Sequence, residues 1–289
     1  MRLDRGQYVR SHGLGNDYLV VDGAGFGLAL TEERIRMICH RHTGVGSDGI
    51  LELVPAPAGF GAAVRIYNPD GSEAEKSGNG VRIFAKFCLD HGYAEAPIRI
   101  HTLGGPVEAY LVAREADRTI LRVSMGKVSF KCADLPMTGS DEWVERKLKV
   151  GDREFTATCL SVGNPHCVIL DAPFDEETAK KYGPLVENHA QFPRRTNVQF
   201  VQVVDRTTVK ALIWERGAGW TLSSGSSSCA VVAACVRAGL TDRHVEVVMP
   251  GGTLDVAVGE DWSLEQIGFA QEISIGHIAA DLWNLLQRG

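Results

Sequence analysis

Long apolar runs, a surplus of basic residues and paired cysteine spacings are all missing from this 289-residue chain. No segment approaches the run of about 18 apolar residues that a membrane-spanning helix needs, and the first residues contain no apolar signal segment. The formal net charge of −6 gives no electrostatic footprint for nucleic acid or for an anionic membrane. We therefore predict a cytoplasmic protein that binds neither nucleic acid nor membrane.

The seven cysteines are odd in number and contain no CxxC pair, which argues against a disulfide scaffold and against a zinc site. Most of them stand between apolar neighbours, as Cys88 and Cys235 do, so we predict buried and unreactive thiols. The nine histidines show no metal-ligand spacing such as HExxH. We expect neither a metal nor a cofactor.

Length and composition are typical of a globular protein with two cores. Hydrophobic residues make up 44% of the chain and charged residues 23%, and 289 residues suit two domains. Short β-branched or alternating runs between turn residues predict many strands. These runs are residues 18–21, 50–54, 63–67, 98–102, 107–112, 119–123, 159–162, 167–170, 197–204, 208–214, 245–248 and 253–258. One helix is predicted to begin at Thr31, and two others are predicted to span residues 175–182 and 278–287.

Two short motifs recur at almost the same offset. Ser77-Gly78-Asn79-Gly80 and Ser224-Gly225-Ser226-Ser227 lie 147 residues apart, and Gly15-Asn16 and Gly163-Asn164 lie 148 apart. An offset near half the chain length predicts two similar halves, because the repeats of a solenoid are far shorter.

Each Ser-Gly motif leads into an apolar segment. Residues 229–236 are apolar around the whole circumference of a helix and must be buried on all sides, and residues 81–89 are nearly so. We predict an α+β fold of two pseudo-symmetric domains, each a strand-rich, barrel-like sheet wrapped around a central buried helix. The expected domains are residues 1–127, joined by 275–289, and residues 128–274.

Helix starts at residues 78–80 and 225–227 would each present unpaired backbone N–H groups and the positive end of a helix dipole. Two such ends at one site would hold a carboxylate, with Ser77 and Ser224 on either side of its α-carbon. The alternative is that both serines act only as N-caps. Neither motif matches a P-loop or a Rossmann fingerprint.

Seven motifs link the chain to a known family. They are Gly13-Leu14-Gly15-Asn16-Asp17, Gly44-Val45-Gly46-Ser47-Asp48-Gly49, Asn68-Pro69-Asp70-Gly71-Ser72-Glu73, Gly78-Asn79-Gly80, Gly163-Asn164-Pro165-His166, Thr196-Asn197-Val198 and Glu215-Arg216-Gly217-Ala218-Gly219. Along nearly its full length the chain resembles diaminopimelate epimerase, the pyridoxal-independent epimerase of lysine and peptidoglycan precursor synthesis. The resemblance implies conversion of LL- to meso-diaminopimelate, a small amino-acid or dicarboxylate substrate, and a homodimer.

The resemblance also implies which residues form the site. The substrate-binding positions are Asn16, Asn68, Gly78, Asn79, Asn164, Asn197, Glu215, Arg216, Gly225 and Ser226. Ser77, Ser224, His166 and Glu215 would be the catalytic set, with His166 and Glu215 near the reacting carbon. Side-chain amides with one Arg–Glu pair suit a zwitterion that has a second carboxylate, because arginine binds carboxylates in a bidentate manner.

Ser77 and Ser224 depart from the family pattern, in which both positions are cysteines that act as thiolate base and thiol acid. A free thiol has a pKa near ~8.5, whereas a serine hydroxyl is a far weaker acid and needs an adjacent base. Two serines therefore cannot simply replace two thiols, and we expect reduced activity or proton transfer by other groups. Lys76 and Trp220 also differ from the family, which favours natural divergence over a Cys→Ser pair made to trap a substrate.

Two other functions stay open at this point. One is an isomerase of a different carboxylate substrate that uses His166, Glu215 or Lys76 for a single-base proton shift. The other is a non-catalytic amino-acid-binding homologue. Trp220 would narrow the pocket or stack on an unsaturated ligand, and its alternative role is that of a packing aromatic.

Overall fold

The computed structural model describes residues 2–139 and 141–288, and the chain divides into two compact units. Unit 1 comprises Met1–Val123 and Gly268–Gly289, and unit 2 comprises Ser124–Ile267. The chain passes from one unit to the other within β8 (Thr119–Lys127) and again within β17 (Ser263–His277). Both strands therefore contribute residues to both units.

Unit 1 is a closed sheet. Strand pairing runs β1–β2–β3–β4–β6–β7–β8–β17 and returns from β17 to β1. The bounds are β1 (Gln7–Gly13), β2 (Asn16–Asp22), β3 (Ile50–Val54), β4 (Ala62–Tyr67), β5 (Glu73–Ala74), β6 (Ile98–Thr102) and β7 (Gly105–Arg114). The short helices α1 (Gly23–Phe26), α2 (Glu32–Cys39) and α6 (Ala280–Leu286) share one apolar cluster with β2.

Unit 2 repeats this strand order. Its strands are β9 (Arg146–Val150), β10 (Arg153–Ser161), β11 (Pro165–Ile169), β12 (Asn197–Val203), β13 (Thr208–Glu215), β14 (Gly219–Thr221), β15 (His244–Met249) and β16 (Gly252–Val258). The parallel pairs β2–β3 and β4–β6 of unit 1 correspond to β11–β12 and β13–β15 of unit 2. A short 3₁₀ helix, η1 (Cys132–Asp134), and α4 (Glu176–Glu187) complete the unit. The matching topology confirms the predicted pseudo-symmetry.

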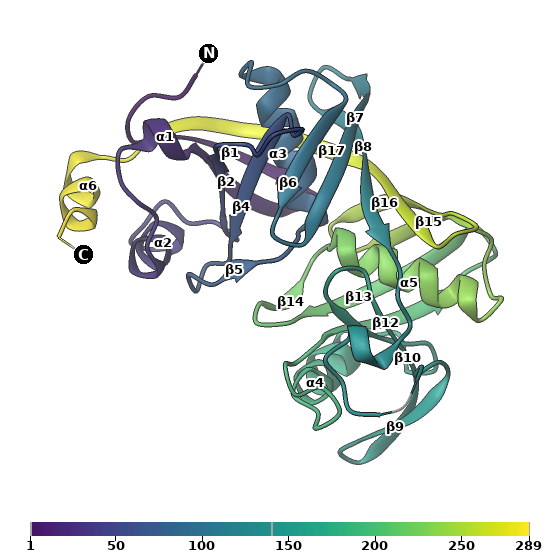
Figure 1. Cartoon of the computed structure of the whole chain (residues 1–289). Helices are drawn as coiled ribbons and strands as arrows, with labels where there is room; N and C mark the ends of the chain where they lie inside the picture. Colours follow the sequence, from purple (N-terminus) through teal and green to yellow (C-terminus); the bar gives the residue numbers. More distant parts are fainter. Residues whose placement is uncertain (1, 140, 289) are drawn as a thin grey trace. The chain divides into compact units, whose positions relative to one another are not determined.

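A buried helix lies at the centre of each unit (Figure 1). In unit 2, α5 (Gly225–Arg237) contacts β10, β11, β12, β13, β15 and β16, and its residues 225–235 are all buried. In unit 1, α3 (Gly78–Asp90) contacts β1, β2, β4 and β7 and buries Ile83 and Phe84 completely. The apolar circumference predicted for residues 229–236 therefore faces strands on several sides, which confirms the predicted fold class.

Each predicted strand run overlaps an observed strand, but five strands were not predicted: β1, β5, β9, β14 and β17. The reason is visible in β17, which is partly exposed along most of its length and mixes Gly, Gln and Glu with its apolar residues. Its apolar alternation is therefore weak, and its sequence gives little strand signal. The conformation of β17 depends on the strands that pair with it. No helix in the described part of the chain is long and apolar enough to cross a bilayer.

The central helices should dominate the stability of their units. We expect Ile83→Ala to lower the free energy of unfolding by about 2–5 kcal/mol, because it leaves a cavity in α3 where the side chain is 0% exposed. The control is Ile273→Ala on β17, where the side chain is 53% exposed and the change should stay within about 0.5 kcal/mol. Urea denaturation of both variants checks this, and equal losses would contradict the central position of α3.

Candidate active site

The candidate site residues of unit 1 gather at the N-terminus of α3. Ser77 is the N-cap, and its Oγ accepts hydrogen bonds from the Gly80 N–H at 3.1 Å and from the Tyr18 hydroxyl at 3.3 Å. A Cβ at Gly80 would lie 3.1 Å from that Oγ, so glycine leaves room for the cap. Because two donors already occupy the acceptor positions of the half-buried Ser77 hydroxyl, its own O–H is the group left for a ligand.

Asn79, in the first turn of α3, is fixed by two neighbours. Its Nδ2 donates to Asn16 Oδ1 at 3.4 Å, and its Oδ1 accepts a short hydrogen bond from Arg82. Arg82 is fully buried and also donates to the backbone oxygens of Gly78 and Phe269, at 3.4 Å each. The first turn of α3 is thus held by a buried guanidinium group.

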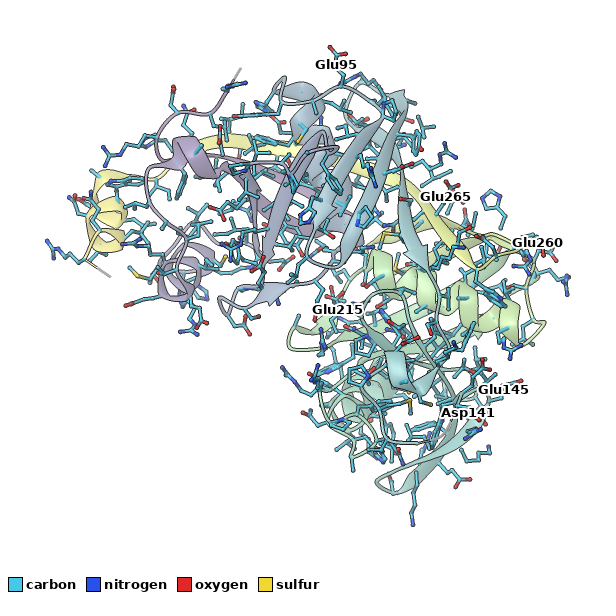
Figure 2. All side chains as sticks on the ribbon, in the orientation of Figure 1. Glu95, Asp141, Glu145, Glu215, Glu260 and Glu265 are labelled. Carbon is cyan, nitrogen blue, oxygen red and sulfur yellow. The ribbon has the colours of Figure 1, made fainter. Side chains whose placement is uncertain are left out.

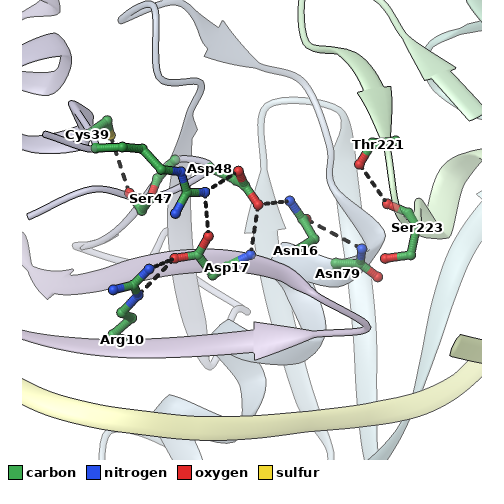
Figure 3. A network of polar contacts seen from close by, with 11 residues as sticks. Arg10, Asn16, Asp17, Cys39, Ser47, Asp48, Asn79, Thr221 and Ser223 are labelled. Carbon is green, nitrogen blue, oxygen red and sulfur yellow. Dashed lines mark hydrogen bonds and ion pairs between the residues drawn. The ribbon is translucent and has the colours of Figure 1, made fainter. Parts of the chain in front are cut away.

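Asn16 is in turn anchored by a network of charged side chains (Figure 3). Its Nδ2 donates to Asp48 at 3.1 Å, and Arg41 joins Asp48 at 2.6 Å to Asp17 at 2.8 Å. Arg10 contacts the other oxygen of Asp17 at 2.7 Å. Burial alone would raise the pKa of Asp17, but the hydrogen bonds from Arg41 and Arg10 hold it below its usual value. The cluster keeps a charged carboxylate next to Asn16 and fixes its amide.

Asn68 and Lys76 complete the positions singled out in unit 1. Asn68 follows β4, and its Nδ2 donates to Ser72 Oγ at 3.0 Å, so its side chain shapes the loop that leads to β5. Lys76 directly precedes the N-cap serine and is buried, with 7% of its surface exposed.

The candidate site residues of unit 2 include the N-terminus of α5. Ser224 is the N-cap, its Oγ accepts from the Ser227 N–H at 3.4 Å, and it lies 3.5 Å from Ser226 Oγ. Gly225 and Ser226 in the first turn are buried. Both duplicated serines are therefore N-caps, and each stands at the positive end of a buried helix.

His166 on β11 lies at the centre of a polar chain in unit 2. Its Nε2 is 2.9 Å from Asn164 Oδ1, and its Nδ1 is 3.0 Å from Gln199 Nε2, which also donates to Ser227 Oγ at 3.0 Å. Because an amide nitrogen only donates, Nδ1 accepts and the proton is on Nε2. Complete burial and the nearby charge of Arg216 lower the pKa of His166 to about 3. The imidazole is neutral.

Asn197 on β12 positions the backbone of the loop that follows β13. Its Nδ2 donates to the Pro165 carbonyl at 2.8 Å, and its Oδ1 accepts from the Arg216 N–H at 3.0 Å. Glu215 ends β13 immediately before this point, and its side chain is half-buried (Figure 2). Asn197 thus links the Asn164-Pro165 segment to the Glu215-Arg216 segment.

Glu187, the last residue of α4, holds the same loop from the other side. Its buried carboxylate accepts from the Gly217 N–H at 2.9 Å and from Trp214 Nε1 at 2.7 Å, and Arg195 pairs with it at 3.2 Å. Three donors on one buried carboxylate fix the turn that carries Arg216.

Sequence reasoning missed several of these supporting residues. Gln199 had a usable signal, since it stands two residues after Asn197 in a strand and therefore shares its face. Arg82 was visible as an exception in an apolar helix. Glu187 gave no signal, because its partners in the loop lie 27 and 30 residues further along the chain.

The cysteines are all buried, which confirms the predicted burial. Burial raises the pKa of Cys88 and of Cys235 to about 12, so neither supplies a thiolate near neutral pH. Within the described ranges, no group of three or more His, Cys, Asp or Glu side chains is placed to hold a metal ion. Trp220 packs against the core of unit 2, as its alternative role required, and Lys180 lies 5.3 Å from its ring centroid.

Comparison with known proteins identifies the family. The sequence profile described as diaminopimelate epimerase matches residues 8–131 and 158–271. The chain is 44% identical over 281 residues to "Diaminopimelate epimerase 2" of Nostoc, covering 96% of this chain and 97% of that protein. It is 38% identical to the diaminopimelate epimerase of Synechocystis, with 93% and 97% covered. The chain belongs to the diaminopimelate epimerase family.

Solved structures show the same fold at lower identity. A probable proline racemase from Agrobacterium radiobacter, with bound carbonate, has a TM-score of 0.72 at 14% identity, covering 98% of this chain and 95% of that one. A hydroxyproline epimerase from Agrobacterium vitis, with bound trans-4-hydroxy-L-proline, also has a TM-score of 0.72, at 16% identity, with 97% and 94% covered. Methylitaconate-delta-isomerase scores 0.63 at 13% identity, with 95% and 96% covered.

In this member of the diaminopimelate epimerase family, the neutral His166 should make stability depend on pH. Between about pH 3 and pH 6.5 the unfolded chain binds a proton at this residue that the folded chain does not. The free energy of unfolding should therefore fall on acidification below about pH 6.5, by up to ~1.4 kcal/mol per pH unit. Urea denaturation across this range measures the slope.

His166→Asn should flatten that slope because the titrating group is removed. His244→Asn is the matched control, since His244 lies in the same unit on an exposed strand position. An equal loss of slope in both variants would show that His166 is not the buried neutral group.

Proposed function

We propose that the chain is a cofactor-independent amino-acid isomerase of the diaminopimelate type, acting between LL- and meso-diaminopimelate. The observation that carries the proposal is the pair of serine-capped, buried helix N-termini, one in each unit, at the two positions that hold thiols in the family. Each end carries the positive pole of a helix dipole, which suits the α-carboxylate of an amino acid.

The remaining polar groups fit the rest of such a substrate. Arg216 provides a guanidinium fork for a distal carboxylate on a loop held by Asn197 and Glu187. The amides of Asn16, Asn68, Asn79 and Asn164 supply donors and acceptors for the two amino-acid ends. A small dicarboxylic amino acid is therefore the ligand class that these side chains favour.

Inversion at the α-carbon needs one group to remove the proton and another to donate a proton from the opposite face. The Ser77 hydroxyl already accepts two hydrogen bonds, so it acts toward a ligand as a donor and not as a base. Both ring nitrogens of His166 are engaged and its pKa is lowered to about 3, which argues against His166 as the base. We infer strong substrate binding and slow epimerisation.

Restoring the thiols tests this proposal. The protein as it stands should epimerise LL-diaminopimelate very slowly, and Ser77→Cys with Ser224→Cys should raise the rate by orders of magnitude. The reason is that acid–base groups of matched pKa contribute on the order of 10²–10⁴-fold each. The measurements are deuterium incorporation at the α-carbon in D₂O and stereochemical conversion. Each single variant serves as a control and should exchange the α-proton on one face with little net inversion.

Rapid epimerisation by the unmodified chain would contradict the assigned role of the serines. It would show that another group, Lys76, His166 or Glu215, transfers the proton. Absence of any exchange in the double cysteine variant, with diaminopimelate bound, would favour a non-catalytic binding protein.

Arg216 should contribute to ligand affinity more than to protein stability. Arg216→Lys keeps the positive charge but loses the bidentate geometry, so diaminopimelate should bind about tenfold or more weakly. Isothermal titration calorimetry measures this. Arg206→Lys is the control, because Arg206 lies in the same unit and pairs with the exposed Asp242. Unchanged affinity in Arg216→Lys would rule out the distal-carboxylate role.

A homodimer and a cytoplasmic location are further parts of this proposal, both drawn from the family resemblance. Light scattering of the purified chain tests the dimer, and a mass equal to one chain of 31.3 kDa would refute it.

A further inference from the structure

A chain of three side-chain hydrogen bonds connects the start of α5 with Asn164. Gln199 Nε2 lies 3.0 Å from Ser227 Oγ and 3.0 Å from His166 Nδ1. The other ring nitrogen, His166 Nε2, lies 2.9 Å from Asn164 Oδ1. Ser227, Gln199 and His166 are each 0% exposed, and Asn164 is half-buried. All four residues belong to unit 2.

The orientation of the Gln199 amide decides the direction of every hydrogen bond in this chain. As placed, both N–H groups of Gln199 donate, and its Oε1 is buried without a hydrogen-bond partner among the described residues. The reverse orientation would satisfy the oxygen but bury two N–H donors without acceptors. Orphaned buried donors are rarer and costlier than an under-satisfied carbonyl oxygen, so the observed orientation is the favoured one.

This orientation has a consequence for the half-buried end of the chain. With Nδ1 accepting from Gln199, His166 carries its proton on Nε2 and donates it to Asn164 Oδ1. The carbonyl oxygen of Asn164 therefore faces His166, and its amide nitrogen is the polar group directed away from the ring. An amide nitrogen donates only, so it recognises an acceptor such as a carboxylate oxygen and not an ammonium group.

We propose that Gln199 is a positioning residue that fixes the Nε2–H tautomer of His166 and thereby makes Asn164 a hydrogen-bond donor to a ligand carboxylate. The ligand part of this proposal rests on the proposed function, whereas the tautomer part does not. Gln199 acts through His166 and Asn164. Gln199 determines which of their atoms donate and which accept, because its two N–H groups donate to Ser227 and His166.

The tautomer is measured directly in the ligand-free protein by long-range ¹H–¹⁵N correlation of ¹⁵N-histidine-labelled chain. We expect His166 to show an unprotonated Nδ1 and a protonated Nε2, unchanged from about pH 5 to pH 8. Gln199→Glu replaces the donor by a carboxylate acceptor of the same shape, so it should place a proton on Nδ1 of His166. A purely structural role for Gln199 would not produce this spectroscopic change.

The matched control is Gln202→Glu, the same substitution on the same strand at an exposed position. It should leave the His166 signals unchanged. If Gln199→Glu fails to fold, as judged by circular dichroism and thermal unfolding, Gln199→Met removes both donors without adding a charge. In that variant the single tautomer should be replaced by a mixture. A protonated Nδ1 in the unmodified protein, or an unprotonated Nδ1 in folded Gln199→Glu, would overturn the proposal.

Ligand titrations test the second part of the proposal, the role of Asn164 as a donor to a ligand carboxylate. Calorimetry with meso-diaminopimelate and with lysine, which lacks the distal carboxylate, gives an affinity ratio for each variant. Gln199→Met should reduce the preference for diaminopimelate by about twofold for an equal mixture of the two tautomers, and Gln202→Glu should not change it. An unchanged preference in Gln199→Met would overturn the role of Asn164 as a carboxylate donor. Failure of the unmodified protein to bind diaminopimelate, with the Nε2–H tautomer observed, would instead refute the proposed function.

Discussion

A helix buried on all sides can meet a ligand only at its ends, and this constraint shapes both units. The eleven residues 225–235 of α5 are all buried, and α3 is buried nearly as completely. At an N-terminus the backbone N–H groups lack helical partners and the dipole is positive. The serine cap satisfies one of these donors in each helix, and the positive end of a helix attracts an anion.

Burying a polar group near these helix ends costs free energy unless the group is hydrogen-bonded, because the surroundings have a low dielectric constant. The two units solve this differently. Unit 1 uses charges: a buried arginine, Arg82, holds the first turn of α3, and the Asp17–Asp48 cluster fixes Asn16. Unit 2 uses neutral groups, with Gln199 and His166 between α5 and Asn164. The duplicated fold thus presents two similar helix ends in two different electrostatic settings.

The two serines change what such a site can do while leaving what it can bind. Under the proposed function the anion-binding property survives the exchange, because a hydroxyl and a thiol can both cap a helix and donate to a carboxylate. Under the same proposal proton abstraction is weakened, because a serine hydroxyl needs an adjacent base and Ser77 instead accepts from Tyr18 and Gly80. His166 is held in hydrogen bonds with Asn164 and Gln199.

The sequence by itself determined the family, the α+β class and the two serine-capped helices. Each of these depends on local information: contiguous motifs, short apolar runs, and the apolar circumference of residues 229–236. Tertiary structure alone decided the strand conformation of segments such as β1, β9 and β17, which depends on the strands beside them. It alone decided the neutral state of His166 and the support that Glu187 gives to the Arg216 loop. Those properties arise from burial and from partners distant in the chain, and neither the degree of burial nor the direction of a hydrogen bond is encoded in a single stretch of residues.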